Sequence, residues 1–312
     1  MKRCPFWVLT GAVLLLAGLD LLCGDGLSWP QGLILWKLRL PRMLTAVVAG
    51  ASLALAGAQM QALFRNPLAD PHIMGVSGGA GLGAAIATLA VGTQSVWLAG
   101  AGLVGGAFAG ALLSGAVIVA VSARVQSTGT LLLAGVMLGF VFSALSSVLQ
   151  YSAGEESLKL FYSWLAGSFS SARLGGLTVM AGTLGLGCIL AILVRKELDL
   201  ALFGDDFATL AGASLHRLRF LSMLGCTLMT GAVTAYCGPI GFVGIVAPHA
   251  ARRLLGKSAH RRVLPAAMLS GAGLALCGDI LAQAFRTPLP VGSTLALIGI
   301  PLILVLLWRN RL

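Results

Sequence analysis

The chain has 312 residues, of which 58% are hydrophobic and 10% are charged, whereas roughly 25% of the residues in a soluble globular domain are charged. So few charges could not cover the surface of a soluble protein, which excludes that class. The net charge of +11 does not indicate nucleic-acid binding, because most basic residues lie at the ends of long apolar runs.

These runs predict a polytopic all-α membrane protein with about ten transmembrane helices. In chain order we expect the spans at residues 6–23, 43–64, 72–91, 96–121, 130–151, 173–194, 218–237, 240–256, 263–284 and 290–308. The third span contains five glycines, and the eighth is short and contains Pro248, so both are expected to be irregular inside the protein. Residues 1–312 are predicted to form one membrane domain.

An even number of spans places both termini on the same side of the membrane. Of the 21 Lys and Arg residues, fifteen then share that side, which the positive-inside rule assigns to the cytoplasm. The six basic residues left on the outer side are Lys37, Arg39, Arg42, Lys159, Arg173 and Arg286.

Patterns typical of enzymes and metal sites are missing from the sequence. There is no GxxxxGK[ST] motif, so we expect that the chain does not hydrolyse ATP itself. The six cysteines form no CxxC pair, and the four histidines are not spaced as ligands. We therefore predict neither a metal site nor a cofactor.

Four polar residues share one side of the fifth span. Their offsets of three, four and seven residues place them on one helix face; they are Ser143, Ser146, Ser147 and Gln150. Such residues either wet a translocation pathway or hydrogen-bond to neighbouring helices. Because glutamine is costly against lipid and useful against water, we favour the pathway.

The longest cytoplasmic loop, residues 195–219, contains the pattern of a short amphipathic helix. Gly204 interrupts the chain, and Asp205 and Asp206 suit a helix N-terminus, where acidic residues complement the helix dipole. The apolar face would consist of Phe207, Leu210 and Ala211. This face needs a cover, either another protein subunit or the lipid headgroups.

Asp279 is the one acidic residue well inside a late span, and it must face protein or water. An ion-coupled secondary transporter would use such a residue, which makes that class the alternative function. A purely structural membrane subunit is a third possibility.

Several stretches together resemble the FecCD/BtuC-type permease family of binding-protein-dependent ABC importers. They are Arg39-Leu-Pro-Arg42, Asn66-Pro-Leu-Ala-Asp-Pro71, the loop 195–219, Gly238-Pro-Ile-Gly-Phe-Val-Gly244 with Pro248-His249, and Leu289-Pro-Val-Gly292. The resemblance covers the chain from about Arg39 to Trp308. It implies a type II importer: ten helices per subunit, a homodimer or close heterodimer, two cytoplasmic ATPase subunits, and a periplasmic substrate-binding protein.

The resemblance also implies roles for particular residues. Coupling to the ATPase would involve Gly204, Asp205, Asp206, Phe207, Ala208, Gly212 and Arg217. The cytoplasmic gate would be formed by Ser127, Thr128 and Gly129, for which an ordinary linker is the alternative. The binding protein would dock on Arg39, Arg42 and Arg286 through its carboxylates. Headgroup anchoring is the alternative for these arginines.

The function implied by the resemblance is import of a metal chelate from periplasm to cytoplasm by ATP-driven alternating access. Iron(III)–siderophore is expected first, then haem or cobalamin. The location would be the inner membrane with both termini cytoplasmic, in contact with lipid and without a nucleic-acid partner.

Overall fold

The computed structural model describes residues 4–23, 32–90, 96–125, 127–171, 174–256, 259–285 and 287–309. Within these ranges every regular element is helical, which confirms the predicted all-α fold. The α-helices are α1 (Cys4–Leu22), α2 (Gly32–Ile34), α3 (Leu40–Leu63), α4 (Val76–Ala85), α5 (Val96–Ser122), α6 (Thr128–Tyr151), α7 (Glu155–Ala166), α8 (Leu174–Leu193), α9 (Arg195–Ala201), α10 (Asp205–Leu210), α11 (Leu215–Cys237), α12 (Val243–Leu255), α13 (His260–Gln283) and α14 (Val291–Arg309). Short π- or 3₁₀-helical segments are Leu35–Arg39, Pro71–Met74, Ile86–Ala90 and Phe169–Ser171.

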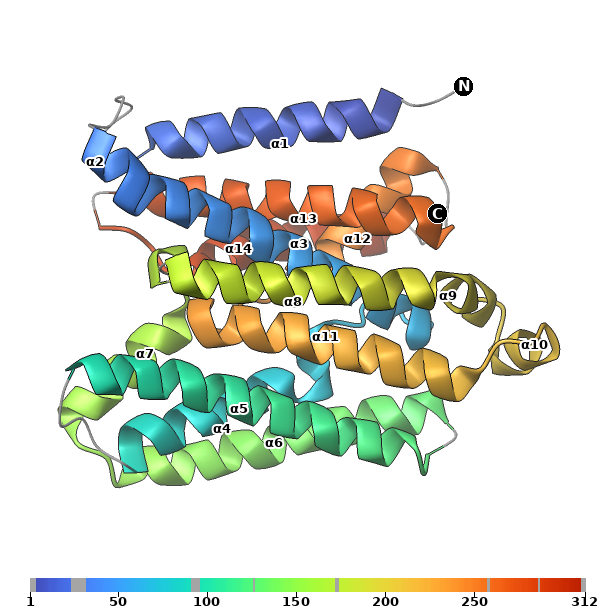
Figure 1. The fold of residues 1–312 in the computed structure, drawn as a ribbon, viewed down its shortest axis with the longest axis horizontal. Coiled ribbons are helices and arrows are strands. Elements are labelled where there is room, and N and C mark those ends of the chain that lie inside the picture. The colour runs from blue at the N-terminus through green and yellow to red at the C-terminus, as the bar shows by residue number, and fades with distance from the viewer. Residues whose placement is uncertain are drawn as a thin grey trace.

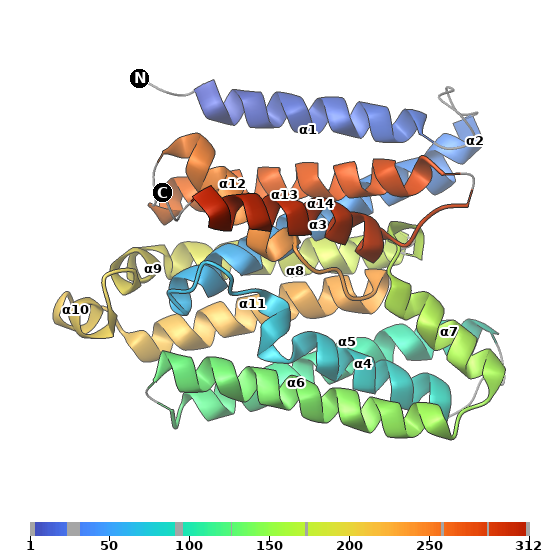
Figure 2. The ribbon, with the colours of Figure 1, turned by 180° about the vertical axis from the view of Figure 1, so that it is seen from behind.

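The long helices run side by side along one common axis (Figure 1). The most enclosed of them is α3, which packs against α8, α11, α12 and α13. The group α4, α5 and α6 lies on the other side of α11 (Figures 1 and 2). The end of α14 lies at the same end of the bundle as the start of α1, and α10 projects beyond the bundle there (Figure 1). This arrangement agrees with an even number of crossings.

Each of the ten predicted spans overlaps one helix. Six helical segments in the described ranges are long and apolar enough to cross a membrane, and three shorter apolar helices occur in α1, around α4 and in α14. The eighth span corresponds to α12, which has 13 residues and is therefore about 20 Å long, against roughly 30 Å of bilayer hydrocarbon. The chain is multi-pass, and the count of ten crossings stays a prediction.

Glycines allow α4 and α5 to touch backbone to backbone. Gly79 lies against Gly110, and Gly83 lies against Gly106. A Cβ atom added to Gly83 would lie 1.9 Å from the carbonyl oxygen of Gly106, far inside van der Waals contact. The spacing of four residues on each helix is the small-xxx-small pattern of membrane helix pairs. Part of the high glycine content is thus explained by close helix packing.

Candidate functional site

Two glycines set the entry and exit of α10. Gly204, the residue before the helix, has φ +113, and Gly212, which follows it, has φ +87. These are left-handed backbone conformations that favour glycine over residues with a Cβ atom. Asp205 and Asp206 occupy the first turn of α10, as the sequence predicts.

The projecting tip carries an exposed apolar patch, made of Phe203, Phe207 and Leu210. Their exposed fractions are 74%, 50% and 89%, and the ring centroids of Phe203 and Phe207 are 5.4 Å apart. Ala208, in contrast, is fully buried. A clustered apolar patch on a segment that extends beyond the bundle (Figure 1) is typical of an interaction surface. Its cover, another protein subunit or the lipid headgroups, stays a prediction.

Asp205 points back to the bundle and joins four segments of the chain. Its Oδ2 atom accepts hydrogen bonds from Nη2 of Arg219 at 3.1 Å and from Oγ1 of Thr128 at 3.3 Å. Its Oδ1 atom lies 3.3 Å from Nη2 of Arg65, just beyond the end of α3. Arg219 also donates from Nη1 to the carbonyl oxygen of Val125, at 3.1 Å. The start of α10 is therefore bonded to α11, to Arg65 after α3 and to the first turn of α6, and Arg219 links α11 to the loop before α6. We name this set the Asp205 network.

The predicted gate residues lie at the start of α6. Ser127 is the N-cap, and its hydroxyl oxygen accepts a hydrogen bond from the backbone N–H of Thr130. Thr128 is nearly buried and contacts α10 through Asp205, while Gly129 is exposed. The structure thus links one of the three predicted gate residues to α10, and the gating and coupling roles stay predictions.

Two other predicted coupling residues, Asp206 and Arg217, are exposed and lie outside the Asp205 network. Arg65 and Arg219, which do meet Asp205, are two of the fifteen basic residues that the positive-inside rule places on the cytoplasmic side. The sequence predicts no other role for them. Sequence alone could not identify which basic residues meet Asp205, because no local pattern pairs them.

The polar stripe on α6 is divided between two environments. Ser143 and Ser147 are exposed, and the hydroxyl of Ser147 donates to the carbonyl oxygen of Ser143. Gln150 is half-buried and accepts a hydrogen bond from the hydroxyl of Tyr162 on α7, at 2.8 Å. Ser146 is buried at 6% exposure, so this member of the predicted stripe turns towards the protein.

This division predicts a labelling pattern. In a background without native cysteines, Ser143→Cys and Ser147→Cys should react with a water-soluble thiol reagent in the assembled transporter, and Gln150→Cys should react more slowly. Ser146→Cys is the matched control and should stay protected, because its side chain packs inside the protein. The measurement is the labelling rate in each nucleotide state. If the cysteines at 143 and 147 stay inert in all of them, the stripe contacts other helices and lines no aqueous pathway.

Two of the sequence stretches behind the resemblance, before α4 and before α12, meet in space. Nε2 of His72 donates to the carbonyl oxygen of Ile240 at 2.7 Å. The buried amide of Gln61 donates to the carbonyl oxygen of Gly244 at 3.3 Å. The side-chain Oε1 atom of Gln61 accepts a hydrogen bond from Nη1 of Arg252 at 2.6 Å. Gln61 therefore joins α3 to α12, a role that sequence reasoning missed.

At the opposite end of the bundle, Arg42 forms a two-pronged ion pair with Asp279. The distances are 2.9 Å from Nε to Oδ2 and 2.7 Å from Nη2 to Oδ1. The Asp279 side chain is fully buried, and that of Arg42 is 17% exposed. The side-chain nitrogen of Gln283 donates to Asp279 and to Asp20 of α1, both at 3.1 Å. Asp279 thus has a charged partner that the sequence analysis did not identify.

The predicted docking arginines therefore differ in their surroundings. Arg42 uses two of its nitrogens on Asp279, whereas Nη1 of Arg39 donates to the carbonyl oxygen of Leu21 at 2.8 Å. Arg286 lies outside the described residues. Their docking role is untested and stays a prediction.

The profile of the FecCD transport family matches residues 5–309. The vitamin B12 import system permease protein BtuC of Klebsiella pneumoniae subsp. pneumoniae is 37% identical over 291 residues, covering 92% of this chain and 86% of the relative. The hemin transport system permease protein HmuU of Yersinia pestis is 37% identical over 278 residues, covering 88% and 83%. A solved inward-facing structure assigned to the metal-chelate type of ABC transporters has a TM-score of 0.86 and 32% identity, and the match covers 97% of this chain and 98% of that one.

Proposed function

Because this chain belongs to the FecCD transport family and is an ABC importer permease, we propose that it imports a metal chelate by ATP-driven alternating access. The functional unit is two copies of the chain, two ATPase subunits that hydrolyse ATP, and a periplasmic binding protein. The α10 end faces the cytoplasm, together with both termini.

The observation that carries this proposal is the Asp205 network. The apolar tip of α10 gives an ATPase subunit a surface to hold. When the ATPase dimer closes, α10 moves, and Asp205 transmits the movement to Thr128 and Arg219 through bonds of 3.1–3.3 Å. Charge-assisted hydrogen bonds suit this task because they are stronger and more directional than neutral ones. An ion-coupled carrier has no need for such a segment.

The substrate is proposed to be a metal tetrapyrrole, cobalamin or haem, since the relatives BtuC and HmuU are permeases of vitamin B12 and hemin transport systems. Iron(III)–siderophore follows as the alternative. The test is ATP hydrolysis by the reconstituted complex with its binding protein loaded with cobalamin, haem or a ferric siderophore. One ligand should stimulate hydrolysis well above the others. Uptake by this chain alone, driven by a proton gradient, would overturn the proposal.

The contacts of Asp279 weaken the secondary-transporter alternative. A coupling carboxylate must release and take up an ion during the cycle. Asp279 is fully buried and held by a two-pronged pair with Arg42. This geometry supports a structural role at the outer end of the bundle.

Docking of the binding protein is best tested at Arg39. We predict that Arg39→Glu weakens binding of the periplasmic protein about ten-fold at low salt and reduces the salt dependence, because ion pairs at an interface rim steer association. Arg42 is avoided because its replacement would also break the pair with Asp279. Lys37→Glu, an equal charge change at an exposed neighbour, is the control. The measurement is affinity of the detergent-solubilised complex across a salt series. An unchanged affinity and salt slope for Arg39→Glu would leave headgroup anchoring as its role.

A further inference from the structure

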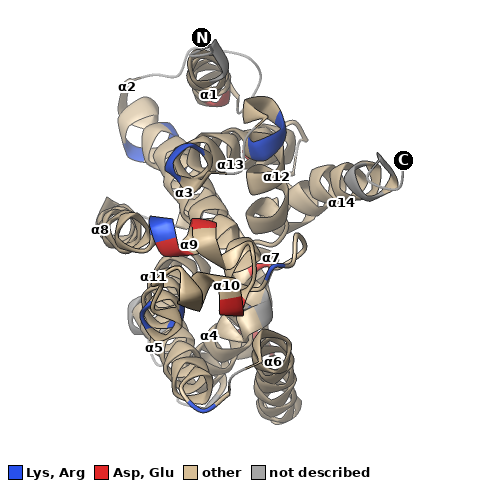
Figure 3. Ribbon diagram, turned by 90° about the vertical axis from the view of Figure 1, so that its right-hand side faces the viewer, with Lys and Arg blue, Asp and Glu red and all other residues tan. Residues whose placement is uncertain are grey.

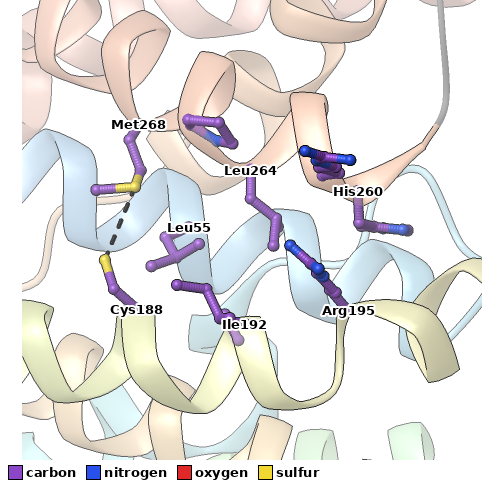
Figure 4. A pocket seen from close by; sticks show the side chains of 10 residues that line it. Leu55, Cys188, Ile192, Arg195, His260, Leu264 and Met268 are labelled. Atoms are coloured by element: carbon purple, nitrogen blue, oxygen red, sulfur yellow. Dashed lines mark hydrogen bonds between the residues drawn. The ribbon is translucent and has the colours of Figure 1, made fainter.

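A cavity of about 330 Å³ lies between α3, α8 and α13, beside the start of α9 (Figure 4). Its size falls at the lower end of small-molecule sites, roughly 300–1,000 Å³. The residues at one end are basic: Arg195, His260 and Arg261. Those at the other end are apolar or contain sulfur: Leu55, Cys188 and Met268. The cavity is thus amphipathic along its length.

The helix geometry gives the distance between the two ends. Cys188 precedes Arg195 by seven residues, and Met268 follows Arg261 by seven. At 1.5 Å per helical residue, each interval is about 10 Å. The sulfur atoms of Cys188 and Met268 lie 3.9 Å apart and close the apolar end. Figure 4 shows Arg195 reaching from the α8–α9 junction towards α13. A ligand therefore needs a charged group and an apolar chain about two helical turns long.

The charged side chains that line the cavity are basic. Neither Arg195 nor Arg261 belongs to any of the salt bridges between described residues, although Arg195 lies close enough to Asp199 of α9 to help lower the pKa of that carboxyl. Asp199 of α9 is taken by His260, whose Nδ1 and backbone nitrogen donate to its Oδ1 atom at 2.6 and 2.8 Å. Burial acts to raise the pKa of Asp199, but these hydrogen bonds hold it below its ordinary value. Asp199 is therefore ionised and already paired.

The position of the cavity in the bundle indicates whether it faces lipid or water. Only 28% of the α8 span is buried within the chain, and α8 lies on the side opposite α6 and α14 (Figure 3). In a bilayer this surface meets lipid. Ile192, which also lines the cavity, is 58% exposed there. With the orientation given by the proposed function, the basic end lies at the level of the cytoplasmic headgroups.

We propose that this cavity binds one anionic phospholipid of the cytoplasmic leaflet. Its phosphate lies between Arg195 and Arg261, and an acyl chain lies over Leu55 and Met268. Arginine suits a phosphate because its planar fork donates two parallel hydrogen bonds. A free phosphate ion would leave the apolar end of the cavity empty of contacts. Basic pockets between membrane helices are an established class of site for anionic headgroups.

The test uses the detergent-purified complex of permease and ATPase, titrated with phosphatidylglycerol, phosphatidylcholine or inorganic phosphate. Bound lipid is counted by native mass spectrometry, and the rise in Tm is recorded. We expect saturable binding and a Tm rise with phosphatidylglycerol only. Arg195→Gln with Arg261→Gln should weaken binding at least ten-fold. Met268→Trp, which fills the apolar end without changing charge, should also weaken it.

The matched control is Arg253→Gln with Arg262→Gln, which removes two exposed charges outside the cavity lining and should bind normally. Equal losses in this control would overturn the site in favour of diffuse surface charge. Equal protection by inorganic phosphate, or undiminished lipid binding by both cavity variants, would also overturn it. The readout is lipid binding and not import. If the cavity does not bind lipid, the proposed function is therefore unaffected. If lipid binds normally but substrate does not stimulate ATP hydrolysis, only the proposed function is contradicted.

Discussion

Asp205→Ala is expected to lower the ATP hydrolysis stimulated by substrate-loaded binding protein roughly 10- to 100-fold, without loss of insertion or assembly. Hydrogen bonds to charged groups are worth about 1.5–3 kcal/mol each, and each 1.4 kcal/mol corresponds to about ten-fold. The bond to Arg219 carries most of this effect, because the Arg219 side chain is 12% exposed. The pair with Arg65 contributes little, because Arg65 is 40% exposed and screened by solvent.

Asp206→Ala is the control for this prediction. It removes the neighbouring carboxylate, which is exposed and outside the Asp205 network, so stimulated hydrolysis should stay near normal. Gly204→Val should reproduce the Asp205 defect, because valine resists the φ of +113 needed at the entry of α10. Thr128→Val should give a smaller loss, since it removes only the bond to α6. Normal stimulation in Asp205→Ala would show that coupling bypasses the network.

The second large effect is expected on stability. Asp279→Ala should lower the free energy of unfolding by about 3–5 kcal/mol, the usual cost of removing one partner from a buried ion pair. The reason is that Arg42, which is 17% exposed, would keep its charge but lose the carboxylate that accepts its hydrogen bonds. Gln283 would also lose one of its two acceptors. The measurement is reversible unfolding in detergent, monitored by circular dichroism or by cysteine accessibility.

A double replacement measures the interaction between Arg42 and Asp279 separately from their interactions with other residues. Arg42→Met with Asp279→Leu should recover most of the loss, because buried ion pairs replaced by apolar residues are often neutral in stability. A double-mutant cycle then gives the coupling energy. Strictly additive losses would contradict the assignment of Asp279 as the partner of Arg42. Normal docking of the binding protein by the double variant would further remove Arg42 from the docking surface.

The course of the helices could be predicted from sequence because the bilayer requires long apolar runs, and each predicted span overlaps a helix. Glycine and proline predict that the third and eighth spans are irregular, but they do not predict which conformations these segments adopt. The 3₁₀ segment Pro71–Met74 precedes α4, and α12 starts after Phe242 with φ +70. These conformations depend on contacts such as that between His72 and Ile240. Such contacts join distant stretches and leave no local periodicity.

For the candidate site, local chemistry was predictable and partners were not. Gly204 and Asp205, which are neighbours in the sequence, predict the start of a helix. Thr128 lies 77 residues away from Asp205, and only the folded chain brings them together. The burial of Ser146 could not be predicted for a similar reason. The spacing of residues defines a helix face, but it does not define how the helix is rotated against its neighbours.

The order in which the chain is synthesised determines when the Arg42–Asp279 pair can form. Its two residues are 237 positions apart, and translation proceeds at about 5–20 residues per second, so Arg42 leaves the ribosome roughly 12 to 47 s before its partner. During that interval the arginine can reach water or headgroups, since it lies in the first turn of α3, at the end of the bundle opposite α10. The helices before α13 are therefore synthesised before the Arg42–Asp279 pair can form. A chain truncated before α13 keeps an unmatched charge at the edge of the bilayer, a feature that distinguishes unfinished copies from complete ones.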